Sequence, residues 1–300
     1  MSELDPGAFA VARATVRDGL ELAYVREGAG GAPLLLLHGW PETRRIWWRN
    51  IAPLAAAGFE VIVPDLRGFG DSGLAPDDRY DTVASALDLH ALVTGVLGHE
   101  RIAAAGGDFG GVIIEDMGLR FAGLIERQSL FNTIPPVLER FEPTPAMRQA
   151  TDYFRRQGRD ADALAAELRT PEERRRYVAQ FYGSRFWAAP GTFDRAAIDF
   201  MTEPFAAADK LRASFGLYES TLGTRPLTEP PRLFERNPLP TLILYGPEDH
   251  VVSRAFPALM ERAFDDPIGP FVVPGAGHFL QWERADLFNR ALAAFLRPSG

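Results

Sequence analysis

The sequence has no cysteine, only one lysine (Lys210) and no long uninterrupted hydrophobic run. Without cysteine, the chain can form neither disulfide bonds nor thiolate metal sites. Its longest apolar stretches, such as PLLLLHGW, are far shorter than the ~20 residues that span a bilayer. The N-terminal stretch MSELDPGAFAVARATVRDG also lacks the apolar core of a signal peptide. We therefore expect a cytoplasmic protein with no membrane partner.

Positive charge is also in deficit. The net charge is −8 at pH 7, from 32 Lys and Arg against 40 Asp and Glu. The arginine-rich stretches RRQGR and ERRR lie among acidic residues, which is typical of solvated helix faces. The negative balance argues against nucleic acid or an anionic membrane as a partner. The 300 residues, 46% of them hydrophobic, are enough to build a large core.

Short apolar runs alternate with helical segments along most of the chain. Continuous apolar runs of strand length, separated by helices, are typical of a parallel sheet with helices on both faces. We therefore expect an α/β fold with a mostly parallel central sheet, and we expect the first run to form part of a hairpin. The predicted strands are LELAYVREG, PLLLLHG, FEVIVPDLRG, IAAAGG, IERQSLFNT, PTLILYG and GPFVVPGAG.

The middle of the chain has a different pattern. Between residues 135 and 231 no run is typical of a buried strand, and proline pairs stand at both ends of this region. Helical segments fill it instead. We predict a helical cap over residues 135–231, inserted into a core that residues 1–134 and 232–300 form together.

Two helices are predicted most clearly within this cap. TPEERRRYVAQFYG begins with a capping box, in which Thr170 precedes Glu173 by three residues, and Pro171 takes the first helical position. The segment PFAAADKLRASFGLYESTL is predicted to form one amphipathic helix. Its expected apolar face carries Leu211, Phe215, Tyr218 and Leu222.

The stretch GGDFGG crowds four glycines around Asp108. It follows the expected strand IAAAGG and opens the helical segment FGGVIIEDMGLRF. Small residues on both sides of a nucleophile, between a strand and a helix, are typical of a nucleophile elbow. The alternative is that Asp108 only caps the helix. A cap does not need glycines on both sides, however, and glycine costs roughly 0.5–1 kcal/mol inside regular elements.

Two further polar residues follow later strands. YGPEDHVV places Asp249 three residues after Gly246, and GAGHF places His278 after the last expected strand. Asp108, Asp249 and His278 thus follow the nucleophile, acid, histidine order of an α/β-hydrolase. Glu248 is the alternative acid, but the spacing from Gly246 favours Asp249.

With HGWP (residues 38–41) and PDLRGFGDS added, the sequence resembles the α/β-hydrolase superfamily over nearly its whole length. HGWP and GGDFGG look like the oxyanion motif and the elbow of epoxide hydrolases, and related dehalogenases also use an Asp nucleophile. Haloalkane dehalogenases usually carry Asn in the HGWP segment and Trp after the nucleophile, where fluoroacetate dehalogenases usually carry Arg. Because Trp40 and Phe109 occupy these positions, the resemblance favours epoxide hydrolysis.

The resemblance implies hydrolysis of a small apolar epoxide to a vicinal diol in two steps. An aspartate carboxylate is already ionised at neutral pH, so Asp108 needs no base to open the ring and form an ester. His278, oriented by Asp249, then activates the water that hydrolyses this ester. The backbone N–H groups of Trp40 and Phe109 are expected to hold the oxyanion. No metal or organic cofactor is implied, because the histidine and the carboxylates already have catalytic roles.

The resemblance also implies two acids, usually tyrosines, that donate from the cap to the epoxide oxygen. Tyr218 in GLYEST stands where the second donor is expected, with core packing as its alternative role. For the first donor, Tyr153 lies one helical turn from the expected position, which holds Ala150. Tyr182 in QFYGSRFW is the other candidate.

Further residues are predicted to line the substrate pocket, although aromatic residues at such positions also occur in plain core packing. His38 is expected to support the oxyanion turn and not to bind a metal. The remaining predicted pocket residues are Pro41, Tyr182, Trp187 and Phe279.

Two other functions stay open at this point. The same nucleophile can hydrolyse a carbon–halogen bond, and the fold can also serve as a ligand receptor without catalysis. Release of diol or of halide from a small substrate panel separates these possibilities. The sequence does not specify the oligomeric state.

Overall fold

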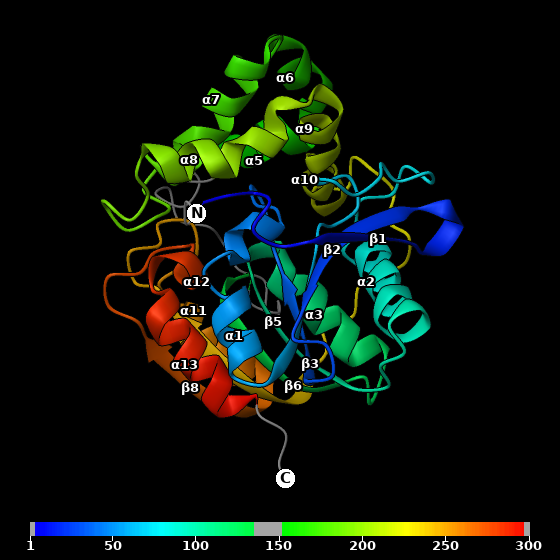
Figure 1. The fold of residues 1–300 in the computed structure, drawn as a ribbon. Coiled ribbons are helices and arrows are strands. Elements are labelled where there is room, and N and C mark those ends of the chain that lie inside the picture. The colour runs from blue at the N-terminus through cyan, green and yellow to red at the C-terminus, as the bar shows by residue number, and fades with distance from the viewer. Residues whose placement is uncertain (1–3, 135–151, 297–300) are drawn as a thin grey trace.

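The computed structural model describes residues 4–134 and 152–296, and one eight-stranded sheet runs through it in the order β1-β2-β4-β3-β5-β6-β7-β8 (Figure 1). Strands β3 to β8 are parallel, whereas β2 is antiparallel to both of its neighbours. This confirms the predicted α/β fold. The strands are β1 (Val11–Thr15), β2 (Glu21–Glu27), β3 (Ala32–Leu37), β4 (Phe59–Pro64), β5 (Ile102–Gly107), β6 (Ile125–Thr133), β7 (Asn237–Tyr245) and β8 (Phe264–Val272).

The predicted strands all form, and the hairpin is completed by a strand that was not predicted. β1 has the sequence VARAT, whose side chains alternate between exposed and half-buried, so it lacks the apolar run of an interior strand. Strand β8 begins five residues before the predicted run GPFVVPGAG, at Phe264. Both differences concern the edges of the sheet, where a strand is less buried and its sequence is less apolar.

Helices pack on both faces of the sheet. Helices α1 and α13 contact each other on one face, and α2 and α3 lie together on the other (Figure 1). Short 3-10 segments and one π-helical stretch, Ala91–Val96, add to them. The helices are α1 (Ile51–Ala56), α2 (Thr82–His90), α3 (Asp108–Arg120), α5 (Asp152–Arg159), α6 (Ala161–Glu167), α7 (Pro171–Tyr182), α8 (Arg195–Thr202), α9 (Ala208–Ser214), α10 (Gly216–Thr221), α11 (Phe256–Ala263), α12 (Leu280–Glu283) and α13 (Ala285–Phe295).

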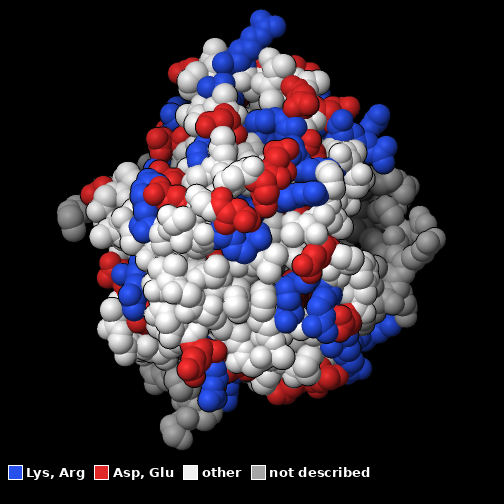
Figure 2. All heavy atoms as spheres, turned by 90° about the vertical axis from the view of Figure 1, so that its right-hand side faces the viewer, with Lys and Arg blue, Asp and Glu red and all other residues white. Residues whose placement is uncertain are grey.

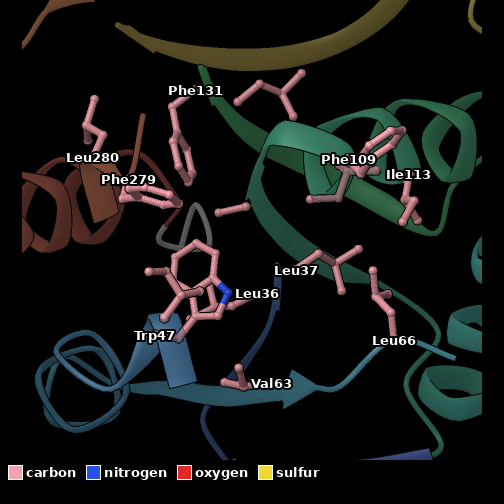
Figure 3. Close-up of a cluster of buried hydrophobic side chains, with 14 of the residues drawn as sticks. Leu36, Leu37, Trp47, Val63, Leu66, Phe109, Ile113, Phe131, Phe279 and Leu280 are labelled. Atoms are coloured by element: carbon pink, nitrogen blue, oxygen red, sulfur yellow. The ribbon is translucent and has the colours of Figure 1, made fainter. Parts of the chain in front are cut away.

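The core is continuous through the sheet because successive side chains of a strand point to opposite faces. On β3, Leu37 lies toward Ile113 of α3, and Leu36 lies beside Trp47 (Figure 3). The Trp47 and Phe131 rings are 6.0 Å apart. This packing holds α3, and with it the expected elbow, firmly against β3 and β5.

Helices α5 to α10 form a separate layer beyond one end of the sheet, between β6 and β7 in the chain (Figure 1). The capping box of α7 is confirmed, since Thr170 accepts from the Glu173 N–H and Glu173 accepts from the Thr170 N–H. The predicted single helix through Tyr218 is wrong. The chain instead forms α9 and α10 with a break at Phe215, and Gly216 packs so closely on Tyr80 that an added Cβ would lie 2.5 Å from it.

The surface carries both signs of charge. Lysine and arginine side chains mix with acidic ones over the face in Figure 2, without a large patch of one sign there. Within residues 4–134 and 152–296, no helix is long and apolar enough to cross a membrane.

Candidate active site

The turn between β5 and α3 forms a strained elbow. Asp108 begins α3 with a φ of 47°, in the left-handed region that costs a residue with a Cβ on the order of 1–3 kcal/mol. An added Cβ on Gly106 would lie 2.8 Å from the Gly110 backbone, and one on Gly110 would strike the Leu37 carbonyl oxygen. The Thr133 hydroxyl donates to the Asp108 carbonyl oxygen at 2.6 Å and fixes the turn. The glycines are therefore needed for the close approach of strand and helix.

His278 lies between two carboxylates. Its Nδ1 is 2.8 Å from Asp249 Oδ2, and its Nε2 is 3.4 Å from Asp108 Oδ2. All three residues are buried. Burial alone would lower the pKa of His278, but the charges of Asp249 and Asp108 outweigh it and raise that pKa well above its ordinary value. The structure thus brings together the three residues expected from distant parts of the sequence.

The environment of Asp249 keeps this carboxyl ionised. Burial would raise the pKa of Asp249, yet His278, Asn132 and the Val251 N–H hold it below its ordinary value. The Asn132 amide donates to Asp249 Oδ2 at 2.8 Å, and the Val251 N–H donates to Oδ1 at 2.6 Å. Glu248, the alternative acid, is exposed to solvent.

Asn132 was missed by sequence reasoning. It is the penultimate residue of β6, with a φ of 38°, and its side chain also exchanges two hydrogen bonds with the Gly246 backbone. It therefore joins the end of β6 to the loop that carries Asp249. The available signal was its place, a polar residue at the carboxyl end of a buried strand.

The second oxygen of Asp108 faces the HGWP turn. The Trp40 backbone N–H donates to Asp108 Oδ1 at 2.8 Å, and an added Cβ on Gly39 would lie 2.5 Å from the Asp108 Cβ. Glu42, also missed from the sequence, accepts from the Gly39 N–H at 2.6 Å and from the Gln281 amide at 2.9 Å. Burial raises the pKa of Glu42 to about 7.

Two tyrosines from the helical layer stand over Asp108. The Tyr153 and Tyr218 rings are 5.6 Å apart, and both pack on Trp40, at 5.8 and 5.4 Å. Both residues are buried, and the Tyr218 hydroxyl has no hydrogen-bond partner among the described residues. Burial raises the pKa of each tyrosine well above its ordinary value, and the Asp108 charge adds to this. Both hydroxyls therefore stay protonated near the carboxylate.

Tyr182 and His38 have their polar atoms engaged elsewhere. The Tyr182 hydroxyl donates to the Pro41 carbonyl oxygen at 2.5 Å, and its ring stacks on Phe279 at 4.6 Å. His38 Nε2 accepts from the Leu66 N–H at 3.0 Å, while Nδ1 lies 2.9 Å from the Gly39 oxygen. Both side chains thus support the HGWP turn and have no free polar atom for a substrate. Ala150, the position originally expected for the first donor, lies outside the described residues.

The loop that carries His278 is fastened to the helical layer. Trp187 packs 4.9 Å from the His278 ring, and its carbonyl oxygen accepts from the His278 N–H at 2.7 Å. Phe279 lies on another side of the ring at 5.1 Å. Glu283, which sequence reasoning missed, accepts from the N–H groups of Ala189, Gly277 and Phe279 at 2.7–2.9 Å.

Comparison with known proteins agrees with this geometry. Residues 34–291 match the model of the alpha/beta hydrolase family. The chain belongs to this family. Over 315 residues the hydrolase is 30% identical to epoxide hydrolase A of Mycobacterium tuberculosis, covering 93% of this chain and 95% of the relative. A shorter match of 130 residues, 43% of each chain, is 37% identical to soluble epoxide hydrolase of Corynebacterium sp. strain C12.

The fold of the hydrolase is also that of solved epoxide hydrolases. The structure of epoxide hydrolase CorEH superposes with a TM-score of 0.83 at 23% identity, over 96% of this chain and 98% of that one. In the part of the hydrolase that the structure describes, no group of three or more His, Asp or Glu side chains is arranged to hold a metal ion.

Proposed function

We propose that this hydrolase converts an epoxide to a vicinal diol through a covalent ester on Asp108. The observation that carries the proposal is the convergence of three groups on that carboxylate: the His278 imidazole and the Tyr153 and Tyr218 side chains. The relatives named as epoxide hydrolases support the same choice of substrate. The epoxide end of the substrate is expected to be apolar, because the Trp40, Phe109, Tyr153 and Tyr218 rings pack together beside Asp108.

In the first step, Asp108 attacks one ring carbon and the carbon–oxygen bond of the epoxide breaks. The electron pair of that bond stays on the oxygen, which takes a proton or hydrogen bond from the cap tyrosines. Tyr153 and Tyr218 suit this role because burial keeps both hydroxyls protonated close to Asp108. Tyr182 does not, because its hydroxyl already donates to Pro41.

In the second step, water attacks the ester carbonyl carbon of Asp108. Esterification removes one of the two negative charges that raise the pKa of His278. The imidazolium then gives up its proton, which replaces the one that the new hydroxyl group took from the cap tyrosines. The imidazole can then accept a proton from water while Asp249 stabilises the resulting imidazolium. The Trp40 N–H, which already contacts Asp108 Oδ1, and the Phe109 N–H stabilise the oxyanion. Collapse of this intermediate releases the diol and restores Asp108.

Hydrolysis of a carbon–halogen bond is the alternative that the same nucleophile permits. The Trp40 indole N–H donates to Ser214 at 3.1 Å, so it is not free to hold a halide ion. We also propose that residues 135–231 form the cap over a core of 1–134 and 232–300. The layer of helices α5 to α10 supports this division for its described part.

A single turnover in heavy-oxygen water tests the covalent step. The label is expected in the Asp108 carboxylate, since water attacks the ester carbonyl carbon. His278→Gln is expected to accumulate the ester, seen as one burst equivalent and a protein heavier by the mass of the substrate, whereas Asp108→Asn gives neither. Label found only in the diol would instead mean that water attacks the epoxide directly.

A further inference from the structure

A cavity of about 330 Å³ adjoins the candidate active site. Its wall includes Phe109, the residue after Asp108 on α3, and Leu217, the residue before Tyr218 on α10. The Phe109 and Tyr218 rings are in edge contact at 5.2 Å. Both residues assigned to ring opening are therefore next in sequence to residues that line this cavity.

The cavity has an apolar path to solvent. Leu227 and Phe234 line it and are 43% and 65% exposed. Val112 lies along the wall between this end and the elbow. The volume of the cavity is at the lower end of the range of small-molecule sites. Such sites usually combine an apolar wall with a few polar groups.

Two polar side chains in the wall have no partner. Glu115 is 1% exposed, and neither of its carboxyl oxygens has a hydrogen-bond partner in the described part of the chain. The Ser220 hydroxyl, on α10, is buried and unpaired in the same way. A buried polar group without a partner is costly, so native proteins rarely keep one without a reason. The catalytic steps proposed above use neither residue.

Glu115 lies at a defined distance from the nucleophile. It follows Asp108 by seven residues on α3. The separation is about 10 Å along the helix axis, which sets the length of the substrate arm that can reach Glu115. Burial alone raises the pKa of Glu115 well above its ordinary value, so the carboxyl is protonated and both donates and accepts hydrogen bonds.

We propose that this cavity binds the second arm of the substrate, and that Glu115 and Ser220 recognise an uncharged hydroxyl or carboxamide group at the far end of that arm. The inference rests on the proposed epoxide hydrolysis and makes Glu115 a specificity-determining residue. A hydroxyl or carboxamide supplies the missing donor and acceptor to both side chains. A methyl end leaves them unpaired. Asp81 also lines the cavity, but its carboxyl oxygens already accept from the Val83, Ala84 and Thr228 N–H groups and from the Thr228 hydroxyl.

The first test compares two terminal epoxides of equal chain length, one ending in a hydroxymethyl group and one in a methyl group. Wild-type enzyme is expected to favour the hydroxyl-ended substrate in kcat/KM by on the order of tenfold or more. Glu115→Leu should remove this preference, and Glu115→Gln, which still donates and accepts, should keep most of it. Ser85→Ala, which removes a buried unpaired hydroxyl on α2, is the matched control and should leave the ratio unchanged.

The second test measures binding without chemistry, using 1,8-octanediol and 1-octanol in titration calorimetry of the whole protein. The diol is expected to bind more tightly to wild type, and Glu115→Leu should equalise the two ligands. If no epoxide is turned over but diol binding still depends on Glu115, the proposed reaction is wrong and the binding site stands. If epoxides are turned over and Glu115→Leu changes neither ratio, the proposal for this cavity is overturned.

Discussion

At the scale of single residues, the site depends on the charge shared between His278 and its two carboxylates. Asp249 is held ionised by His278, Asn132 and backbone N–H groups, and its Oδ2 lies 2.8 Å from the imidazole Nδ1. Asp108 is the one member of the pair whose charge disappears when the ester forms. In the proposed reaction, His278 therefore becomes able to act as a base once the charge of Asp108 is lost.

The tyrosines give a prediction at the same scale. Tyr218→Phe keeps the ring packed on Trp40 and Phe109 and removes a hydroxyl that has no partner among the described residues. Alkylation of Asp108 is expected to slow by on the order of 10²–10³, as when one oxyanion donor is removed. The melting temperature should stay nearly the same. Stopped-flow measurement of the two half-reactions is the check, and hydrolysis of a preformed ester should hardly change.

Tyr153→Phe and Tyr182→Phe complete this experiment. The Tyr153 change is expected to resemble that at Tyr218, whereas Tyr182→Phe should mainly lower stability, because its hydroxyl donates to Pro41. A Tyr182→Phe enzyme with the larger loss in alkylation would reverse the assignment of the first donor. If Tyr218→Phe alkylates Asp108 at the wild-type rate, a carbon–halogen substrate becomes the better proposal.

At the scale of elements, the elbow requires β3, β5 and α3 to approach closely. Gly110→Ala places a Cβ against the Leu37 carbonyl oxygen, so the unfolding free energy is expected to fall by about 1–3 kcal/mol. Gly95→Ala is the matched control, since it lies in the π-helical stretch with no atom within 4 Å of an added Cβ. That change should be neutral or stabilise the protein by roughly 0.5–1 kcal/mol. Urea unfolding measures the unfolding free energies of the two variants. Equal values would mean that the elbow can hold a Cβ at position 110.

Elements also show what the sequence can predict and what it cannot. Buried strands such as β3 and β5 are continuous apolar runs, so they can be predicted from the local sequence. The residues Asp108, Asp249 and His278 could be found because each follows such a run. The break between α9 and α10 could not, because the buried residues Leu211, Phe215 and Tyr218 keep a helical spacing across it.

The site residues were missed for another reason. Asn132, Glu42 and Glu283 are polar residues whose roles come from backbone groups of other segments. A glutamate in a sequence is ordinarily expected at the surface. Only the folded chain shows that Asn132 and Glu42 are buried, that Glu283 is half-buried, and what each side chain binds.

At the scale of the whole molecule, hydrogen bonds connect the helical layer to the core beside His278. Glu283 of the core accepts hydrogen bonds from Ala189 in the helical layer and from Gly277 and Phe279 on both sides of His278. The His278 N–H in turn donates to the Trp187 carbonyl oxygen. The Glu283 carboxyl group thus links the position of His278 to the position of the helical layer that carries Tyr153 and Tyr218.

The titration of Glu283 should make the unfolding free energy depend on pH in a defined direction. Burial raises the pKa of Glu283 from an ordinary 4.5 to about 7, although its backbone N–H partners lower it. Between these two values the folded protein holds a proton that the unfolded chain has lost, so the contribution of Glu283 to stability decreases as pH rises, by up to roughly 1.4 kcal/mol per pH unit. Glu283→Gln does not titrate. Its unfolding free energy relative to wild type is therefore expected to increase from pH 5 to pH 7 and to level off above, as urea denaturation at each pH would measure. A difference that decreases over this range would mean that the three N–H donors outweigh burial and that Glu283 is a carboxylate throughout.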